Sequence, residues 1–310
     1  MRILVLGAGG TGGYFGGRLA QSGADVVFLV RPSRAEQLRE HGLQLRSALG
    51  DADLPVAWAT AETLPGLAAR KPFGLVLLSC KAYDLDSSIE AIEPAMTGDA
   101  CVLPILNGLR HYAALDKRFG REQVLGGLCF IVATKGAGGI VRHMGRAASI
   151  LFGERDGDPD SARTAAFSAA CLKAGIDHVR SMRIAQQQWE KYAFLTALAA
   201  GTCLMRNDIG HIVAADDGAD FMRSLYRECV AVAEAEGEAI SPEAQATALD
   251  IVLERGSRLT ASMLRDLQAG YPIEAEQIVG DMLQRARRAG QDAPLLTMAW
   301  CHLQAYQAQT

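Results

Sequence analysis

The sequence has few of the features that support metal sites, disulfide frameworks or membrane spans. Its seven cysteines form no C-x-x-C pair and are odd in number, so we expect reduced, mostly buried thiols. Its six histidines show no ligand spacing, and we predict no metal site. The longest mainly apolar run, residues 192–205, is too short to cross a bilayer. The net charge of −4 argues against a nucleic-acid-binding surface.

Length and composition favour two domains with a core each. The chain has 310 residues, of which 49% are apolar. A strand predicted from residue 2 leaves no room for a secretory signal peptide, so we expect a cytoplasmic protein. We expect a small-molecule substrate rather than a nucleic acid or membrane as its partner, and we leave a homodimer open.

A glycine-rich loop follows the first predicted strand, residues 2–6. The loop consists of Gly7, Ala8, Gly9, Gly10, Thr11 and Gly12. Gly7 permits a tight turn, Gly9 lets the backbone approach a phosphate, and Gly12 allows close packing of helix on strand. A helix predicted over 11–22 would direct its free N–H groups at the anion. We therefore assign these six residues to a dinucleotide-binding site.

The end of the second predicted strand, residues 25–30, indicates which dinucleotide binds. An NAD site usually has a carboxylate there for the ribose hydroxyls, and none is present. Arg31 and Arg34 follow instead, and guanidinium groups suit a 2′-phosphate. The alternative is that both are solvated residues opening the next helix. We predict NADPH as the cofactor, bound by Arg31.

The pattern along the chain changes character near residue 182. Before it, strands and helices alternate as in a parallel sheet, with predicted strands over 73–80, 100–106, 124–133, 139–143 and 149–152 and helices over 34–41 and 159–174. After it, only helical periodicity appears, over 189–205, 221–236, 242–255, 260–269 and 273–289. We predict an α/β fold with an N-terminal Rossmann-type doubly wound sheet (1–182) and an all-helical C-terminal domain (183–310) for substrate binding and dimerisation. The active site is expected in the cleft between them.

Polar residues stand out at the ends of two predicted strands. Lys81 and Asn107 each follow a buried strand, where open α/β sheets bind ligands. Turn chemistry explains both equally well, since Asn-Gly is a common turn dipeptide.

Lys191 lies near the start of the longest apolar helix. A partly desolvated lysine can act as an acid toward a carbonyl oxygen, although more often such a lysine extends to solvent. Ser262 and Glu274 lie in the late helical region, and Glu274 has a simpler explanation as a first-turn residue that complements the helix dipole.

Together these segments resemble the ketopantoate reductase (2-dehydropantoate 2-reductase) family. The shared features run in the same order over residues 7–274: the glycine loop, the arginine after the second strand, Cys-Lys-Ala, Leu-Asn-Gly, Trp-Glu-Lys, Ser-Met-Leu-x-Asp and Pro-x-Glu. The resemblance implies that Lys191 is the proton donor and that Glu274 belongs to the catalytic and cofactor-binding set. It further implies that Ser262 binds substrate, that Lys81 and Asn107 line the cofactor and substrate cleft, and that the backbone at Ala133 touches the cofactor.

One departure from the family pattern concerns the substrate. Members with ketopantoate chemistry tend to carry asparagines four and eight residues after the lysine, on its helix face. Here these positions are Leu195 and Ala199, and a further family asparagine falls near the apolar Ile209. We expect Leu195 and Ala199 to face the substrate, and the alternative is that they are core residues.

The sequence thus predicts an NADP-dependent oxidoreductase acting on CH–OH groups, which reduces a 2-oxo acid to a 2-hydroxy acid. The first substrate is 2-dehydropantoate, giving pantoate for pantothenate biosynthesis. A more apolar 2-oxo acid or ketone is the alternative, and a non-catalytic NADPH-binding redox sensor is an alternative of another class. In the expected reaction, Lys191 protonates the developing alkoxide, and the Asn107 amide helps to stabilise the negative charge on that oxygen.

Overall fold

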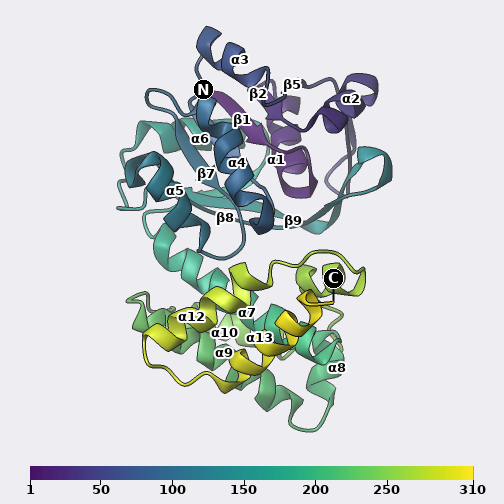
Figure 1. Cartoon of the computed structure of the whole chain (residues 1–310), viewed down its shortest axis with the longest axis vertical. Helices are drawn as coiled ribbons and strands as arrows, with labels where there is room; N and C mark the ends of the chain where they lie inside the picture. The colour runs from purple at the N-terminus through teal and green to yellow at the C-terminus, as the bar shows by residue number, and fades with distance from the viewer. Residues whose placement is uncertain (310) are drawn as a thin grey trace. The chain divides into compact units, whose positions relative to one another are not determined.

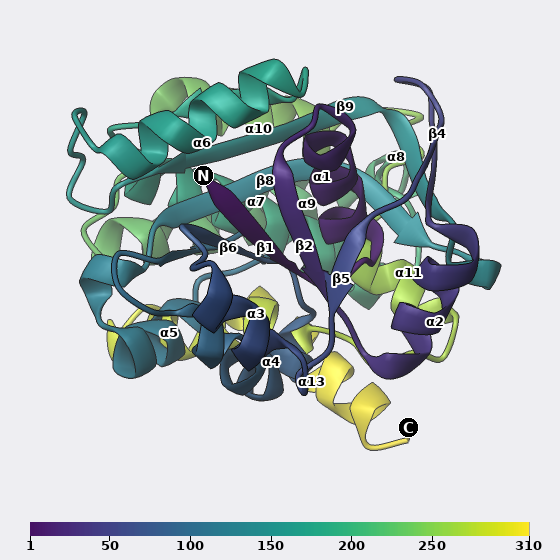
Figure 2. The same ribbon diagram turned by 90° about the horizontal axis from the view of Figure 1, so that it is seen from above.

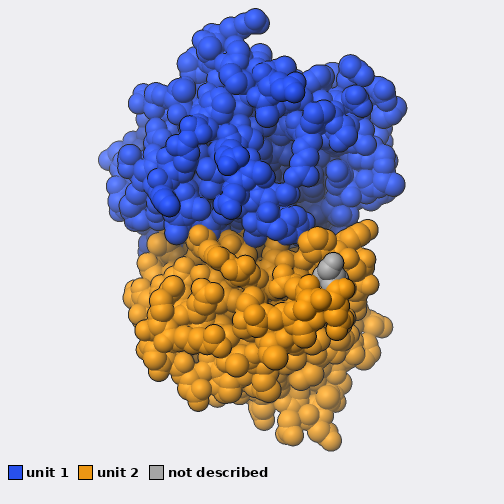
Figure 3. Space-filling model, viewed as in Figure 1, with its two compact units in different colours: residues 1–106, 111–184 blue, residues 107–110, 185–310 orange. Residues whose placement is uncertain are grey.

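The structure is a computed structural model that describes residues 1–309. The chain divides into two compact units (Figure 3), and the first contains residues 1–106 and 111–184. The second contains residues 107–110 and the chain from 185 onward. The division therefore falls two residues after the expected boundary at 182. The inclusion of residues 107–110 in the second unit was not expected from the sequence.

The first unit contains a five-stranded parallel sheet. Its strands, in spatial order, are β5 (Ala57–Ala59), β2 (Asp25–Leu29), β1 (Arg2–Leu6), β6 (Leu75–Leu78) and β7 (Cys101–Pro104). The strands β6 and β7 are fully buried, as continuous apolar runs predict. This strand order, with the glycine loop after β1, is Rossmann-type and confirms the predicted fold class.

A second, mixed sheet completes this unit and was not predicted as separate. It is formed by β3 (Leu43–Ser47), β4 (Ala52–Leu54), β8 (Gly126–Lys135), β9 (Val141–Gly153) and β10 (Asp177–Arg180). The two strands expected at 139–143 and 149–152 are one long strand, β9, which corrects the prediction. The expected break corresponds to a register shift, because Ile131 pairs with Ala148 while Ala133 pairs with His143.

The first unit also contains six α-helices, which are labelled in Figure 2: α1 (Gly10–Gln21), α2 (Pro32–His41), α3 (Leu64–Arg70), α4 (Leu85–Ile92), α5 (His111–Phe119) and α6 (Ala162–Lys173). Helix α1 contacts β1 and β2 of the parallel sheet and β3, β8 and β9 of the mixed sheet, so it joins the two. It ends as expected, with Gly23 in the left-handed region (φ 84°) just beyond the C-cap. Phe15 and Phe28 are fully buried in this core.

In the part that the structure describes, the second unit consists of helices, the loops between them and the turn at residues 107–110 (Figure 1). Its elements are α7 (Ile184–Met205), α8 (Ile209–Ala214), α9 (Gly218–Ala235), α10 (Pro242–Val252), α11 (Ser262–Gln268), the π-helix η5 (Glu276–Gly280), α12 (Asp281–Arg288) and α13 (Pro294–Gln307). The short α8 and the C-terminal α13 were not predicted. The helix expected at 273–289 is a π-helical turn followed by α12. Tyr192, Met222 and Tyr226 are buried in the core of this unit.

The cysteines behave as small apolar residues. Five of them are buried, Cys80 is half-buried and Cys301 is exposed, and none forms a disulfide within residues 1–309. Burial raises the pKa of the Cys101 thiol to about 11 and that of Cys171 to about 12, so both stay protonated. Over the same residues, no helix is long and apolar enough to span a membrane. No group of three or more His, Cys, Asp or Glu side chains in the described chain is arranged to hold a metal ion.

Candidate cofactor-binding and catalytic sites

The glycine loop of the first unit has the backbone geometry that its sequence predicts. Gly7 adopts a φ of 84° and its N–H donates to Leu29 O at 2.8 Å, which ties the turn to the end of β2. A Cβ on Gly12 would overlap Ser79 Oγ and lie 2.6 Å from Gly7 O. A Cβ on Gly9 would meet nothing within 4 Å, so this side of the loop is open. The three glycines thus serve different structural needs.

The start of α1 beside this loop suits an anion. Gly9 is the N-cap residue and has no side chain to bond the first N–H groups, and the first turn carries no acidic residue. These N–H groups and the positive end of the helix dipole are the features that hold phosphates in dinucleotide sites. The residues present therefore fit a pyrophosphate group.

Ala133 of β8 lies against the same loop. A Cβ added to Gly10 would come within 2.5 Å of Ala133 O, so the backbones of Gly10 and Ala133 are in direct contact. Lys81, half-buried, precedes the 3₁₀ turn η1 (Ala82–Asp84) at the end of β6. Leu78 of β6 pairs with Leu6 of β1, so these two parallel strands end at the same edge of the sheet. The segments that follow them, with Lys81 and the glycine loop, begin at that edge.

The two arginines after β2 have different environments. Arg34 is only 8% exposed, and its Nη2 donates to Ala8 O at 3.1 Å. Burial lowers the pKa of this guanidinium, and its hydrogen bond connects α2 to the glycine loop. The expectation that Arg34 suits a 2′-phosphate is therefore wrong. Arg31 has a side chain that is 77% exposed and forms an ion pair with Asp84 at 2.9 Å.

In the second unit, Lys191 and Asn107 are brought together across 84 residues of sequence. Lys191 lies on α7, half-buried, and its Nζ donates to Asn107 Oδ1 at 3.1 Å. The Asn107 carbonyl accepts a hydrogen bond from Gln277 Nε2 at 3.2 Å. Since the amide oxygen of Asn107 is engaged by Lys191, the Nδ2 hydrogens are its donors toward other groups.

Gln277 is a site residue that sequence reasoning missed. It is 5% exposed and belongs to η5, and π-helical turns often mark functional sites. Gly108 has a φ of 75°, and a Cβ there would lie 2.7 Å from Gln277 O. The Asn-Gly turn is therefore fixed by close packing on η5. No pattern in a single sequence signals this contact, because the partners lie 170 residues apart.

A buried polar network supports the turn of α7 that carries Lys191. Tyr192 is 1% exposed, and its single hydroxyl hydrogen is shared between two acceptors, Ile278 O at 2.9 Å and Asp281 Oδ2 at 3.1 Å. Arg285 Nε donates to the same Asp281 oxygen at 2.8 Å and also pairs with Glu236. Burial, together with the Asp281 charge, raises the pKa of Tyr192 well above its usual value, so the hydroxyl remains a donor. The network links α7 to η5.

The remaining candidate residues have the following positions. Glu274 is 8% exposed and its carbonyl accepts from Ile278 N–H. Ser262 is half-buried at the start of α11, where the preceding Ala261 N–H donates to Thr202 of α7. Leu195 is partly buried against the helical core, whereas Ala199 is 0% exposed within it. The position of Ala199 corrects the expectation that it faces substrate, because a residue without accessible surface cannot contact a ligand.

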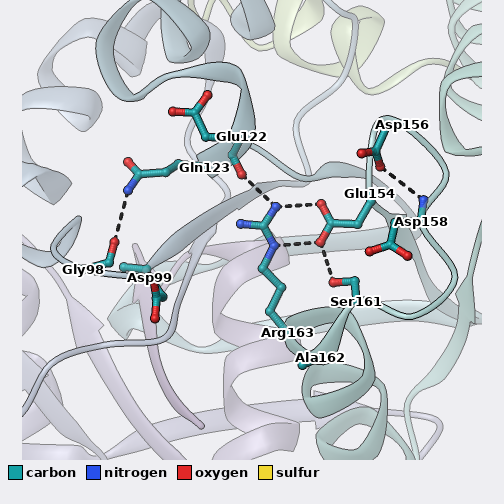
Figure 4. A pocket seen from close by; sticks show the side chains of 11 residues that line it. Gly98, Asp99, Glu122, Gln123, Glu154, Asp156, Asp158, Ser161, Ala162 and Arg163 are labelled. Atoms are coloured by element: carbon teal, nitrogen blue, oxygen red, sulfur yellow. Dashed lines mark hydrogen bonds and ion pairs between the residues drawn. The ribbon is translucent and has the colours of Figure 1, made fainter.

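A pocket of about 590 Å³ lies in the first unit, and its lining includes none of these candidate residues (Figure 4). Its wall includes Glu154, which accepts two hydrogen bonds from Arg163 and one from Ser161. Burial alone would raise the pKa of Glu154, but these hydrogen bonds outweigh it and hold the pKa below its usual value. The central charges of this pocket are therefore satisfied within the protein and stabilise its own fold.

The fold and the loop geometry define a Rossmann-type protein with a helical second unit, and comparison with known proteins places it in a family. The model of "Ketopantoate reductase PanE/ApbA" matches residues 3–157, and that of its C-terminal region matches residues 183–307. The chain belongs to this ketopantoate reductase family and is an oxidoreductase.

Relatives differ in how specifically they are named. The "Uncharacterized oxidoreductase YkpB" of Bacillus subtilis is 34% identical over 310 residues, which cover 100% of both chains. A 2-dehydropantoate 2-reductase of Halobacterium salinarum is 31% identical, over 93% of this chain and 92% of its own. The crystal structure of the 2-dehydropantoate 2-reductase of Geobacter metallireducens has a TM-score of 0.88 at 29% identity, covering 98% and 99% of the two chains.

Proposed function

We propose that this protein is an NADPH-dependent reductase of 2-oxo acids, with 2-dehydropantoate, reduced to pantoate, as the first candidate substrate. The observation that carries the proposal is the 3.1 Å hydrogen bond between Lys191 and Asn107, formed at positions that match the family motifs. The protein would act in the cytoplasm, in pantothenate biosynthesis.

The nicotinamide cofactor, when bound, supplies the hydride that reduces the carbonyl carbon. Gly7, Gly9 and Gly12 shape the turn that receives its pyrophosphate, and the uncapped start of α1 provides N–H donors. Arg31 is the candidate ligand of a 2′-phosphate, because its guanidinium is exposed. Arg31→Ala is expected to weaken NADPH binding at least about tenfold and to leave NADH binding nearly unchanged, as calorimetric titration would show.

Lys191 is the proposed proton donor to the alkoxide oxygen that forms as the carbonyl is reduced. Its ammonium is oriented by Asn107, whose Nδ2 hydrogens provide a second donor for the same oxygen. Gln277 holds the Asn107 backbone in place. Glu274 and Ser262 are proposed to contact the nicotinamide and the substrate.

A more apolar 2-oxo acid or ketone is a second candidate substrate, and Leu195 favours it. Leu195 lies one helical turn after Lys191 and is only partly buried. An apolar side chain there removes an amide donor that the family's ketopantoate enzymes tend to have.

The experiment that tests the proposal is NADPH oxidation over a panel of 2-oxo acids. The panel includes ketopantoate and acids with purely aliphatic and aromatic side chains. Turnover of one or more of them supports the reductase, and the best substrate decides between the two candidates. If the protein binds NADPH in a titration but oxidises it with no member of the panel, the redox-sensor alternative replaces the proposal.

A further inference from the structure

A carboxylate reaches the end of β2 from another part of the chain. Asp84 Oδ1 forms an ion pair with Arg31 Nη2 at 2.9 Å, although 53 residues separate the two. Asp84 is the last residue of η1, which follows β6, whereas Arg31 is the N-cap residue of α2, which follows β2. The side chain of Asp84 is 36% exposed and that of Arg31 is 77% exposed. The pair therefore lies at the surface, open to a ligand.

This pair brings together the two groups that distinguish the two nicotinamide dinucleotides. A carboxylate at the end of the second strand accepts hydrogen bonds from the ribose hydroxyls of NAD, and an arginine there accommodates the 2′-phosphate of NADP. The sequence shows only the arginine at this place, and the fold adds the acid from η1. An exposed ion pair is weak and exchanges readily, so a 2′-phosphate can compete with Asp84 for Arg31.

We propose that Asp84 sets the cofactor preference of this protein: its carboxylate repels the 2′-phosphate of NADPH and accepts a hydrogen bond from the 2′-hydroxyl of NADH. The carboxylate neutralises Arg31 and repels a phosphate at the same place, so it lowers the advantage of NADPH over NADH. With a neutral residue at position 84, the Arg31 guanidinium would pair with the 2′-phosphate without a competing carboxylate. This inference rests on the proposed function, because it assumes that the glycine loop binds a nicotinamide dinucleotide.

The test measures binding rather than turnover. Dissociation constants of NADPH and NADH are determined by calorimetric titration for the wild type and for Asp84→Asn, a nearly isosteric change that removes the charge. The fragments 2′,5′-ADP and 5′-AMP serve as probes that lack the nicotinamide. The control is Asp86→Asn, which removes an exposed charge two residues away, in the first turn of α4.

We expect Asp84→Asn to tighten the binding of NADPH and of 2′,5′-ADP roughly threefold to tenfold and to weaken the binding of NADH. Asp86→Asn should change each dissociation constant less than about twofold. The gain for NADPH should shrink at high salt, where surface charges are screened. If the wild type binds both dinucleotides but Asp84→Asn leaves the preference unchanged, or if the two variants have equal effects, this inference is overturned and the proposed function is not. Failure of the wild type to bind either dinucleotide overturns the proposed function and the inference together.

Discussion

Replacing Tyr192 by Phe tests whether the buried network holds α7 against η5. The change deletes one hydroxyl in a side chain that is 1% exposed and removes its hydrogen bonding to Ile278 O and Asp281 Oδ2. A net hydrogen bond contributes about 0.5–1.5 kcal/mol, and one to a charged partner about 1.5–3 kcal/mol. Asp281 Oδ2 keeps Arg285 as a donor and Ile278 O keeps the Asp281 N–H, which limits the loss. We therefore expect the free energy of unfolding of the helical unit to fall by about 2 kcal/mol.

The matched control is Tyr306→Phe in the same unit. Tyr306 also donates to a backbone carbonyl, Tyr271 O at 3.2 Å, but that bond is exposed. Its loss should cost less than about 0.5 kcal/mol, because water replaces the missing partner.

The assay is urea unfolding followed by tryptophan fluorescence, since two of the three tryptophans, Trp189 and Trp300, lie in the helical unit. With a slope of about 2 kcal/mol per molar urea, a 2 kcal/mol loss shifts the midpoint by about 1 M. A shift for Tyr192→Phe no larger than that of the control would refute the network argument. Such a result would mean that the hydroxyl is hydrated in solution.

Two further predictions concern burial and pH. Ala199→Asn should lower the free energy of unfolding by about 2–4 kcal/mol, because it forces an amide into a core site with 0% exposure. Leu195→Asn, at a partly buried position, should cost less than half as much, and equal urea midpoints for the two variants would contradict the assigned burial. The pKa of Glu154 is depressed below its usual value, so the carboxylate stabilises the fold above the ordinary pKa of a glutamate, and this stabilisation is lost as the pH falls through the folded pKa. The stability advantage of wild type over Glu154→Gln should therefore be present at about pH 6 and shrink toward about pH 3, whereas a constant difference would show that the charge is not responsible.

Local patterns in the sequence predicted the elements that depend on local geometry. The first strand is Arg2–Leu6 as expected, and α1 and Gly23 follow it as the glycine spacing and C-cap chemistry require. The turn at Asn107 was also predictable as a turn. Its neighbour Gly108 adopts the positive φ that such turns favour.

What the sequence could not show depends on contacts between distant segments. Gln277 touches the Asn107 turn across 170 residues, and Asp84 meets Arg31 across 53. Periodicity describes which face of an element is apolar but not which element covers it. For this reason, Arg34 was expected to suit a 2′-phosphate although it is buried and bonded to Ala8 O of the glycine loop. For the same reason, Ala199 was placed toward substrate although its face of α7 is in the core.

The central claim is that Lys191 donates the proton, and its replacement tests that claim most directly. With the best substrate from the panel, kcat is measured for the wild type, Lys191→Ala and the control Lys173→Ala, which changes an exposed lysine at the end of α6. We expect Lys191→Ala to lower kcat at least about 100-fold while NADPH affinity stays within about twofold, because a general acid acts mainly in the transition state. Retention of more than about a tenth of the wild-type kcat by Lys191→Ala would contradict it.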